Sequence, residues 1–154
     1  MSDLSRLIID ELALLREFVA LLGREQQALI PGDIERLLPL AEEKSRQAAA
    51  LGRLADARNQ LLQKAGLATD KSGMETWLAS QEPTAPSRAD WATLLTLAAE
   101  AKLQNEINGK LIDNRMRHNR HALAVLHAAA DQAMLYGPDG QAHATGSGRS
   151  RGAA

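Results

Sequence analysis

Residues 4–33 read LSRLIIDELALLREFVALLGREQQALIPGD, and this stretch decides the fold. Apolar side chains recur in it at spacings of three and four, with only Gln26 polar in the series: Ile8, Leu12, Leu15, Val19, Leu22 and Leu29. This spacing is typical of an amphipathic α-helix that packs as in a coiled coil. We therefore expect a helix over residues 4–29, with charged residues such as Glu11 away from the centre of its apolar stripe.

The segment Pro31-Gly32-Asp33 ends this helix. Proline disfavours helical backbone in the residue before it, glycine permits a tight turn, and Asp33 can cap a following helix. A break this short predicts an antiparallel hairpin, with a second helix over residues 34–65 and Gly66 just beyond its end. Pro39 lies inside that helix, where we expect a local kink.

The connection over residues 67–87 differs from the helices on either side. Its middle predicts one short helix over residues 73–79, capped by Asp70 or Ser72. A connection of this length is long for a helical bundle, and such segments are often mobile or functional.

A third helix is expected from about residue 87, capped by Ser87, to about residue 135, because Gly109 is the only breaker in between. At ~1.5 Å per residue it would be roughly 70 Å long, so part of it should project beyond its shorter partners. Asn105 and Asn108 fall on its apolar stripe, where asparagine fixes register at a cost in stability.

The composition agrees with these helices, because Leu and Ala are abundant while the β-branched residues that favour strands are scarce. The predicted fold class is all-α: an antiparallel, coiled-coil-like bundle of three main helices, the third the longest. We expect this bundle to form one domain over residues 1–140 and residues 141–154 to be a disordered tail, because the tail is too polar to bury a core.

Several classes of protein are excluded by the same composition. The chain has no cysteine, no basic segment ahead of an apolar run at its N-terminus, and no uninterrupted apolar stretch long enough for a membrane. Its net charge is −1, and we interpret the basic residues Lys110, Arg115, Arg117 and Arg120 as a solvated helix face. We therefore expect a cytoplasmic protein without membrane insertion or nucleic-acid binding.

No arrangement of residues indicates catalysis, a metal or another cofactor. His118, His121 and His127 are too few for a metal site, and no glutamate has a histidine three residues later, as a di-iron bundle needs. Gly-rich phosphate loops and hydrolase motifs are also missing. The sequence predicts a protein that is not an enzyme and that binds other proteins.

Two features near the C-terminus leave alternatives open. Residues 122–130, ALAVLHAAA, either belong to the core or need a partner from outside, because large exposed apolar patches mark interaction sites. Tyr136, the only tyrosine, is either a packing residue or a docking anchor, since aromatic residues are enriched at binding hot spots.

Four segments in order resemble one family, the flagellar export chaperones of the FlgN type. They are GDI at residues 32–34, EEKS at 42–45, NEINGKLI at 105–112 followed by Asn119 and ALAVL, and LYGPDGQ at 135–141. The resemblance covers roughly residues 4–141. It rests chiefly on the asparagine stripe and the LYGPDGQ ending, while residues 67–87 contribute no recognised pattern.

The resemblance implies a cytoplasmic chaperone for hook-associated proteins, which form the hook–filament junction. Such a chaperone prevents their premature assembly and delivers them to the flagellar type III export gate. It further implies that Tyr136 docks on the gate and that cargo binds the C-terminal part of the last helix. The cargo-binding residues carried over are Ala122, Leu123, Val125, Leu126, Ala129, Ala130, Ala133 and Met134.

An alternative from another class is a structural coiled-coil subunit that self-associates through its third helix. A weak homodimer is also compatible with the sequence. The sequence does not decide which hook-associated protein is bound or whether the free protein is a monomer.

Overall fold

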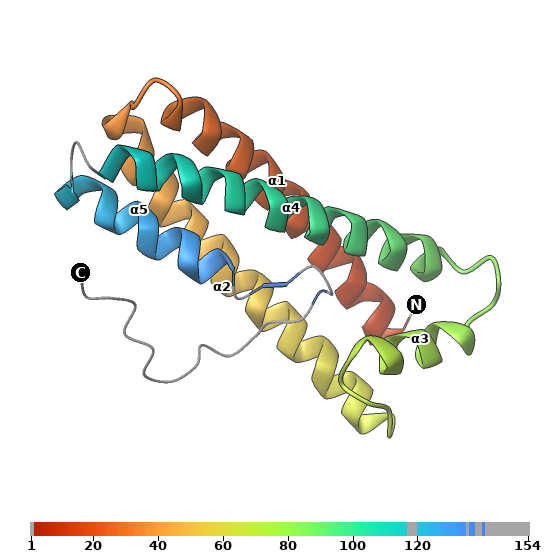
Figure 1. Ribbon diagram of the computed structural model, residues 1–154. Helices are drawn as coiled ribbons and strands as arrows, with labels where there is room; N and C mark the ends of the chain where they lie inside the picture. The colour runs from red at the N-terminus through yellow and green to blue at the C-terminus, as the bar shows by residue number, and fades with distance from the viewer. Residues whose placement is uncertain (1, 117–119, 135, 138–139, 141–154) are drawn as a thin grey trace.

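The computed structural model describes residues 2–116, 120–134, 136–137 and 140, without the side chains of residues 116 and 120–123. Its helices are α1 (Asp3–Leu29), α2 (Ile34–Lys64), α3 (Lys71–Ala79), α4 (Pro86–Met116) and α5 (Arg120–Ala133). The long helices α1, α2 and α4 lie side by side, α5 covers the half of the bundle nearest the α1–α2 turn, and the short α3 lies near the N-terminus (Figure 1). The predicted all-α fold class is confirmed.

The α1–α2 hairpin follows from its caps and its turn. The Ser2 hydroxyl accepts a hydrogen bond from the backbone N–H of Ser5 at the start of α1, and Asp33 Oδ1 accepts one from that of Arg36 at the start of α2. Gly32 between them has a φ of 73°, which a residue with a side chain rarely adopts. The antiparallel hairpin predicted from Pro31-Gly32-Asp33 is confirmed.

The expected short helix forms as α3, and Asp70 caps it by accepting a hydrogen bond from the backbone N–H of Gly73. A side chain at Gly73 would place its Cβ 1.7 Å from the carbonyl oxygen of Ala68, so the chain turns here only with glycine. The α4 helix begins at Pro86, a residue well suited to a first helical position, so the expected cap at Ser87 is wrong.

The expectation of one long, projecting third helix is wrong. The α4 helix ends at Met116, and α5 begins at Arg120 and packs back against both α4 and α2. Residues 113–121 read DNRMRHNRH, so ending a helix there sacrifices almost no apolar burial. By returning to the bundle, α5 buries an apolar stripe that would face water on a projecting helix: Leu126, Ala129, Ala130 and Ala133.

The core lies between the facing stripes of the helices and is built mainly from leucine and alanine. No helix in the described part of the chain is long and apolar enough to cross a membrane.

Candidate functional site

Two ion pairs are buried between α1 and α2. Glu11 pairs with Arg58 and Glu25 pairs with Lys44, and all four side chains are at most 1% exposed. Glu11 and Glu25 lie fourteen residues apart on α1, as do Lys44 and Arg58 on α2, so both pairs occupy the same antiparallel register two heptads apart. The expectation that Glu11 lies away from the buried stripe is therefore wrong.

The Glu25–Lys44 pair is completed by α4. Lys44 Nζ donates to Glu25 Oε1 over 2.8 Å, and Asn108 Nδ2 donates to the same oxygen over 2.8 Å and to the Leu22 carbonyl over 2.9 Å. Gln104 in turn donates to Asn108 Oδ1. The prediction that an asparagine fixes the register of α4 thus has a structural basis, because the amide ties α4 to one position on α1.

Burial lowers the pKa of Lys44 from its ordinary value, and the neighbouring Glu25 carboxylate acts in the opposite direction. Glu25 Oε2 is buried and has no hydrogen-bond partner among the described residues. This cluster is therefore costly to bury, as expected where a lysine neutralises only one oxygen of a carboxylate.

The Glu11–Arg58 pair is completed by the C-terminal segment. Arg58 Nε and Nη2 donate to the two Glu11 oxygens, both over 2.9 Å, and the Tyr136 hydroxyl donates to Glu11 Oε1 over 2.6 Å. Arg58 Nη2 also donates to the Gly140 carbonyl, and its guanidinium lies 4.9 Å from the centre of the Trp91 ring. We call Glu11, Arg58, Tyr136 and Gly140 the C-terminal clasp.

Tyr136 is 6% exposed, so in this structure it packs against the bundle, as the first of the two alternatives left open by the sequence requires. Burial, together with the negative charge of Glu11, raises the pKa of Tyr136 well above its ordinary value, so the phenol stays protonated and able to donate. Gly140 has a φ of 75°, and a Cβ there would lie 3.3 Å from atoms of Leu94 and Trp91. Glycine therefore permits the chain to reach Arg58 at this point.

The residues expected to bind cargo divide between the two sides of α5. Leu126, Ala129, Ala130 and Ala133 face the bundle and are buried. Val125 is 52% exposed and Met134 is 41% exposed. The side chains of Ala122 and Leu123 lie outside the described part of the chain. Of the three histidines named above, His118 and the side chain of His121 also lie outside it.

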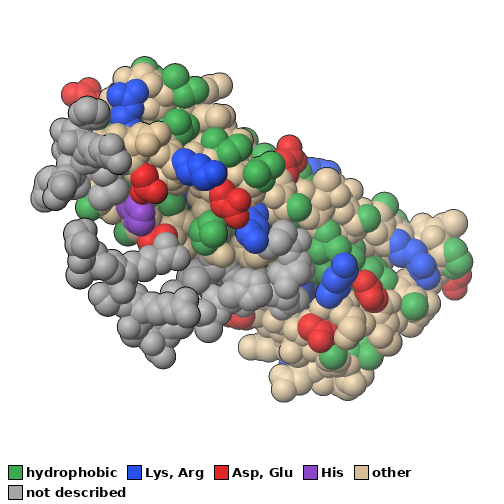
Figure 2. Space-filling model, in the orientation of Figure 1, with side chains coloured by type: hydrophobic (Ala, Val, Ile, Leu, Met, Phe, Trp, Pro, Cys, Tyr) green, Lys and Arg blue, Asp and Glu red, His purple; other side chains and the backbone are tan. Residues whose placement is uncertain are grey.

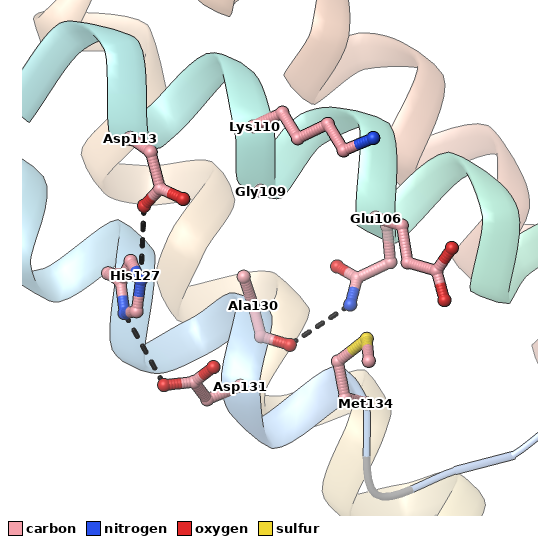
Figure 3. Close-up of a pocket in the computed structure, with 9 residues that line it drawn as sticks. Glu106, Gly109, Lys110, Asp113, His127, Ala130, Asp131 and Met134 are labelled. Atoms are coloured by element: carbon pink, nitrogen blue, oxygen red, sulfur yellow. Dashed lines mark hydrogen bonds and ion pairs between the residues drawn. The ribbon is translucent and has the colours of Figure 1, made fainter. Parts of the chain in front are cut away.

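Polar contacts also tie α5 to its neighbours. Asn105 Nδ2 on α4 donates to the Ala130 carbonyl over 3.0 Å (Figure 3). His127 lies between two carboxylates, with Nε2 3.2 Å from Asp113 of α4 and Nδ1 3.3 Å from Asp131 of α5. A groove of about 260 Å³ runs between α4 and α5 beside these contacts.

Among the described residues, no group of three or more histidine or carboxylate side chains is placed so that it could hold a metal ion. His127 contacts its two carboxylates through opposite ring nitrogens. The surface shown in Figure 2 carries positive and negative side chains interspersed, without a single dominant sign. The α5 helix is amphipathic: its apolar stripe is buried against the bundle, and Val125 is exposed on its other side.

Comparisons with known proteins agree on one family. The profile of the family described as FlgN protein matches residues 1–144. The flagella synthesis protein FlgN of Yersinia enterocolitica is 34% identical over 134 residues, which cover 86% of this chain and 84% of that protein. The protein of the same description from Proteus mirabilis is 30% identical over 145 residues, covering 92% and 91%.

One solved structure is also similar. It is described as a crystal structure of a flagella synthesis protein FlgN from Pseudomonas aeruginosa, and it matches with a TM-score of 0.67 over 85% of this chain and 98% of that one. At 22% sequence identity, this likeness supports the fold alone.

Proposed function

The chain belongs to the FlgN protein family, and we propose that it is a cytoplasmic chaperone of flagellar export. It binds hook-associated proteins, prevents their premature assembly and delivers them to the flagellar type III export gate. The observation that carries this proposal is α5, a short amphipathic helix that can be exchanged for, or joined by, a helix of the cargo.

The placement of α5 suggests two steps of cargo binding. Val125 and Met134 are exposed, so they are available for first contact while α5 remains on the bundle. Leu126 and the three buried alanines become available only if α5 moves away from α2 and α4. Cargo that replaces α5 against these helices would cover the apolar surface that α5 leaves behind, which limits the cost of opening.

Docking on the export gate requires a similar release. In this proposal Tyr136 is the docking residue, and it has to leave Glu11 before another protein can contact its ring. Opening of the C-terminal clasp therefore couples cargo binding to gate docking, because the same segment follows directly after α5.

The test is calorimetric titration of the protein with a purified hook-associated protein. We expect Val125→Asp combined with Met134→Asp to weaken binding by roughly tenfold or more, since a charge at an apolar interface is left unpaired. The control is Ile9→Asp on α1, because Ile9 is also exposed, at 39%, but lies on another helix. Equal weakening by both variants, or no binding by the wild type, would contradict the proposal.

Hydrogen exchange adds information on the mechanism. If α5 leaves the bundle, the amides of residues 124–133 should change their protection from hydrogen exchange when cargo is added, while those of α1 stay unchanged.

Gate docking is tested by titrating Tyr136→Ala against the soluble domain of the gate. Unchanged affinity would exclude Tyr136 as the docking residue.

A further inference from the structure

The α4 helix carries a second stripe that no part of the described chain covers. Leu103 is 59% exposed and Ile107 is 38% exposed, on the side of α4 away from its buried residues. Other residues of α4 contact the rest of the bundle. Gly109 and Asp113 line the groove shared with α5, and Arg115 donates to the Ile30 carbonyl at the α1–α2 turn. In Figure 2, hydrophobic side chains lie on this side of the bundle next to a row of charged ones.

The exposed residues follow a heptad pattern. Spacings of four, three, four, three and four residues connect six exposed positions, which we call the outer stripe: Thr96, Glu100, Leu103, Ile107, Lys110 and Asn114. These spacings place six side chains along one line of a helix, as the a and d positions of a coiled coil require. The outer stripe extends about 27 Å along α4, at ~1.5 Å per residue.

The outer stripe is complementary to itself when read backwards. Leu103 and Ile107 lie at its centre, Glu100 lies three residues before Leu103, and Lys110 lies three residues after Ile107. Neither Glu100 nor Lys110 forms an ion pair within the described part of the chain. In an antiparallel pair of identical helices, each a position faces a d position of the other helix. Glu100 of each copy therefore lies opposite Lys110 of the other copy, and the two-fold symmetry gives this contact twice.

We propose that the outer stripe binds a second copy of this chain, with the two α4 helices antiparallel. Leu103 then packs against Ile107 of the partner subunit, and Glu100 pairs with Lys110 of the partner subunit. Two-fold symmetry repeats both contacts. An unrelated amphipathic helix would not explain why the acid and the base lie at equal distances from the apolar centre.

The dimer is expected to be weak. Only two large apolar side chains from each copy lie at its centre, and the flanking ion pairs stay close to water, where such pairs contribute little. The charges therefore act mainly on specificity, since like charges placed opposite each other disfavour a wrong register. The apolar centre of this association is separate from the cargo-binding residues, because Leu103 and Ile107 do not line the groove between α4 and α5. Lys110 borders that groove, which Met134 also lines, so the two sites approach each other only at this lysine.

Sedimentation velocity over a series of protein concentrations tests the proposal. We expect reversible dimers for the wild type, and roughly tenfold weaker association for Glu100→Lys and for Lys110→Glu, because each places like charges opposite each other twice. An equimolar mixture of the two variants should recover the dimer, as should the double variant. Leu103→Asp should abolish it, while Ile9→Asp on α1 serves as the exposed control and should leave it unchanged.

Cysteine cross-linking tests the register. The chain has no cysteine of its own, so Leu103→Cys and Ile107→Cys introduce single thiols. A mixture of these two variants should form disulfide dimers faster than either variant alone, because the two positions face each other. A wild type that stays monomeric at all concentrations, charge variants that do not recover on mixing, or equal cross-linking rates would overturn the proposal. If the wild type is monomeric and Leu103→Asp loses cargo binding, the outer stripe binds cargo and not a second copy of the chain.

Discussion

The Glu25–Lys44 pair and the Glu11–Arg58 pair have the same register and the same signs of charge, but a different part of the chain completes each of them. Asn108 completes the first from the C-terminal half of α4, a helix that packs along α1. Tyr136 completes the second from the segment that follows α5. The first cluster is thus part of the helical framework, whereas the second binds the segment that follows α5. In the function proposed above, this segment leaves while α1, α2 and α4 stay together.

The two ion pairs also differ in their basic residue, which is lysine in the first and arginine in the second. Lys44 is a compact charge that reaches one oxygen of Glu25. Arg58 holds both oxygens of Glu11 and still donates to the Gly140 carbonyl, because its guanidinium has donors in a fixed plane. If Tyr136 and Gly140 leave, the bidentate pair remains, so Glu11 keeps its charge neutralised in the opened state.

The largest effect is expected from Arg58→Met. Removing the arginine leaves Glu11 buried without a positive partner, and breaking a buried ion pair in this way costs about 3–5 kcal/mol of unfolding free energy. The Gly140 carbonyl loses a donor as well. Urea denaturation of the wild type and the variant measures the change.

The double variant Glu11→Leu with Arg58→Met is the control for this prediction. Replacing a buried ion pair by apolar residues of similar volume is often neutral, so most of the lost stability should return. A single variant as stable as the wild type would mean that Glu11 is not charged or not buried in solution.

A smaller effect should separate the two clusters. Asn108→Ala removes a donor to the buried Glu25 carboxylate and to the Leu22 carbonyl, and we expect a loss of about 2 kcal/mol in global stability. Tyr136→Phe removes one hydrogen bond at the edge of the fold, and should cost about 1 kcal/mol.

Hydrogen exchange gives the sharper contrast between these two variants. Asn108→Ala should reduce protection throughout α1 and α4, because it weakens the framework. Tyr136→Phe should reduce protection in α5 alone. If both variants affect the same amides, the C-terminal clasp is not a separate opening unit and the comparison fails.

Local sequence patterns were sufficient to predict part of this structure. The spacing of Ile8, Leu12 and Leu15, and the Pro31-Gly32-Asp33 turn, predicted the hairpin, because helix periodicity and turn chemistry act over few residues. The break between α4 and α5 was missed, because no proline or glycine marks residues 113–121. There the tertiary packing of α5 outweighs the helical preference of the segment.

The clasp was missed for a different reason. Glu11 was assigned to the solvent side because it is charged, although Glu25 lies two heptads later and Lys44 and Arg58 match them on α2. That repeated spacing is the signal that could have revealed both pairs. The position of Tyr136 over Glu11 has no such signal, since 125 residues separate them in the chain.

The last prediction concerns the pKa of Tyr136. It has the smallest effect on stability at neutral pH, and it reports on the C-terminal clasp alone. Its pKa is raised by burial and by Glu11, so the folded state favours the protonated phenol. The stabilisation it contributes is therefore fully present below the ordinary tyrosine pKa of about 10 and is lost as the pH rises through the folded value. Because Tyr136 is the only tyrosine, the ultraviolet absorbance of phenolate reports this group alone.

We expect the pKa of Tyr136 to lie well above its ordinary value in both the wild type and Asn108→Ala, provided both remain folded. Added cargo should lower the pKa of Tyr136 toward the ordinary value, because opening of the C-terminal clasp exposes the ring to water. A wild type that titrates near 10 without cargo would show that the clasp is already open, and would remove the difference between the two clusters.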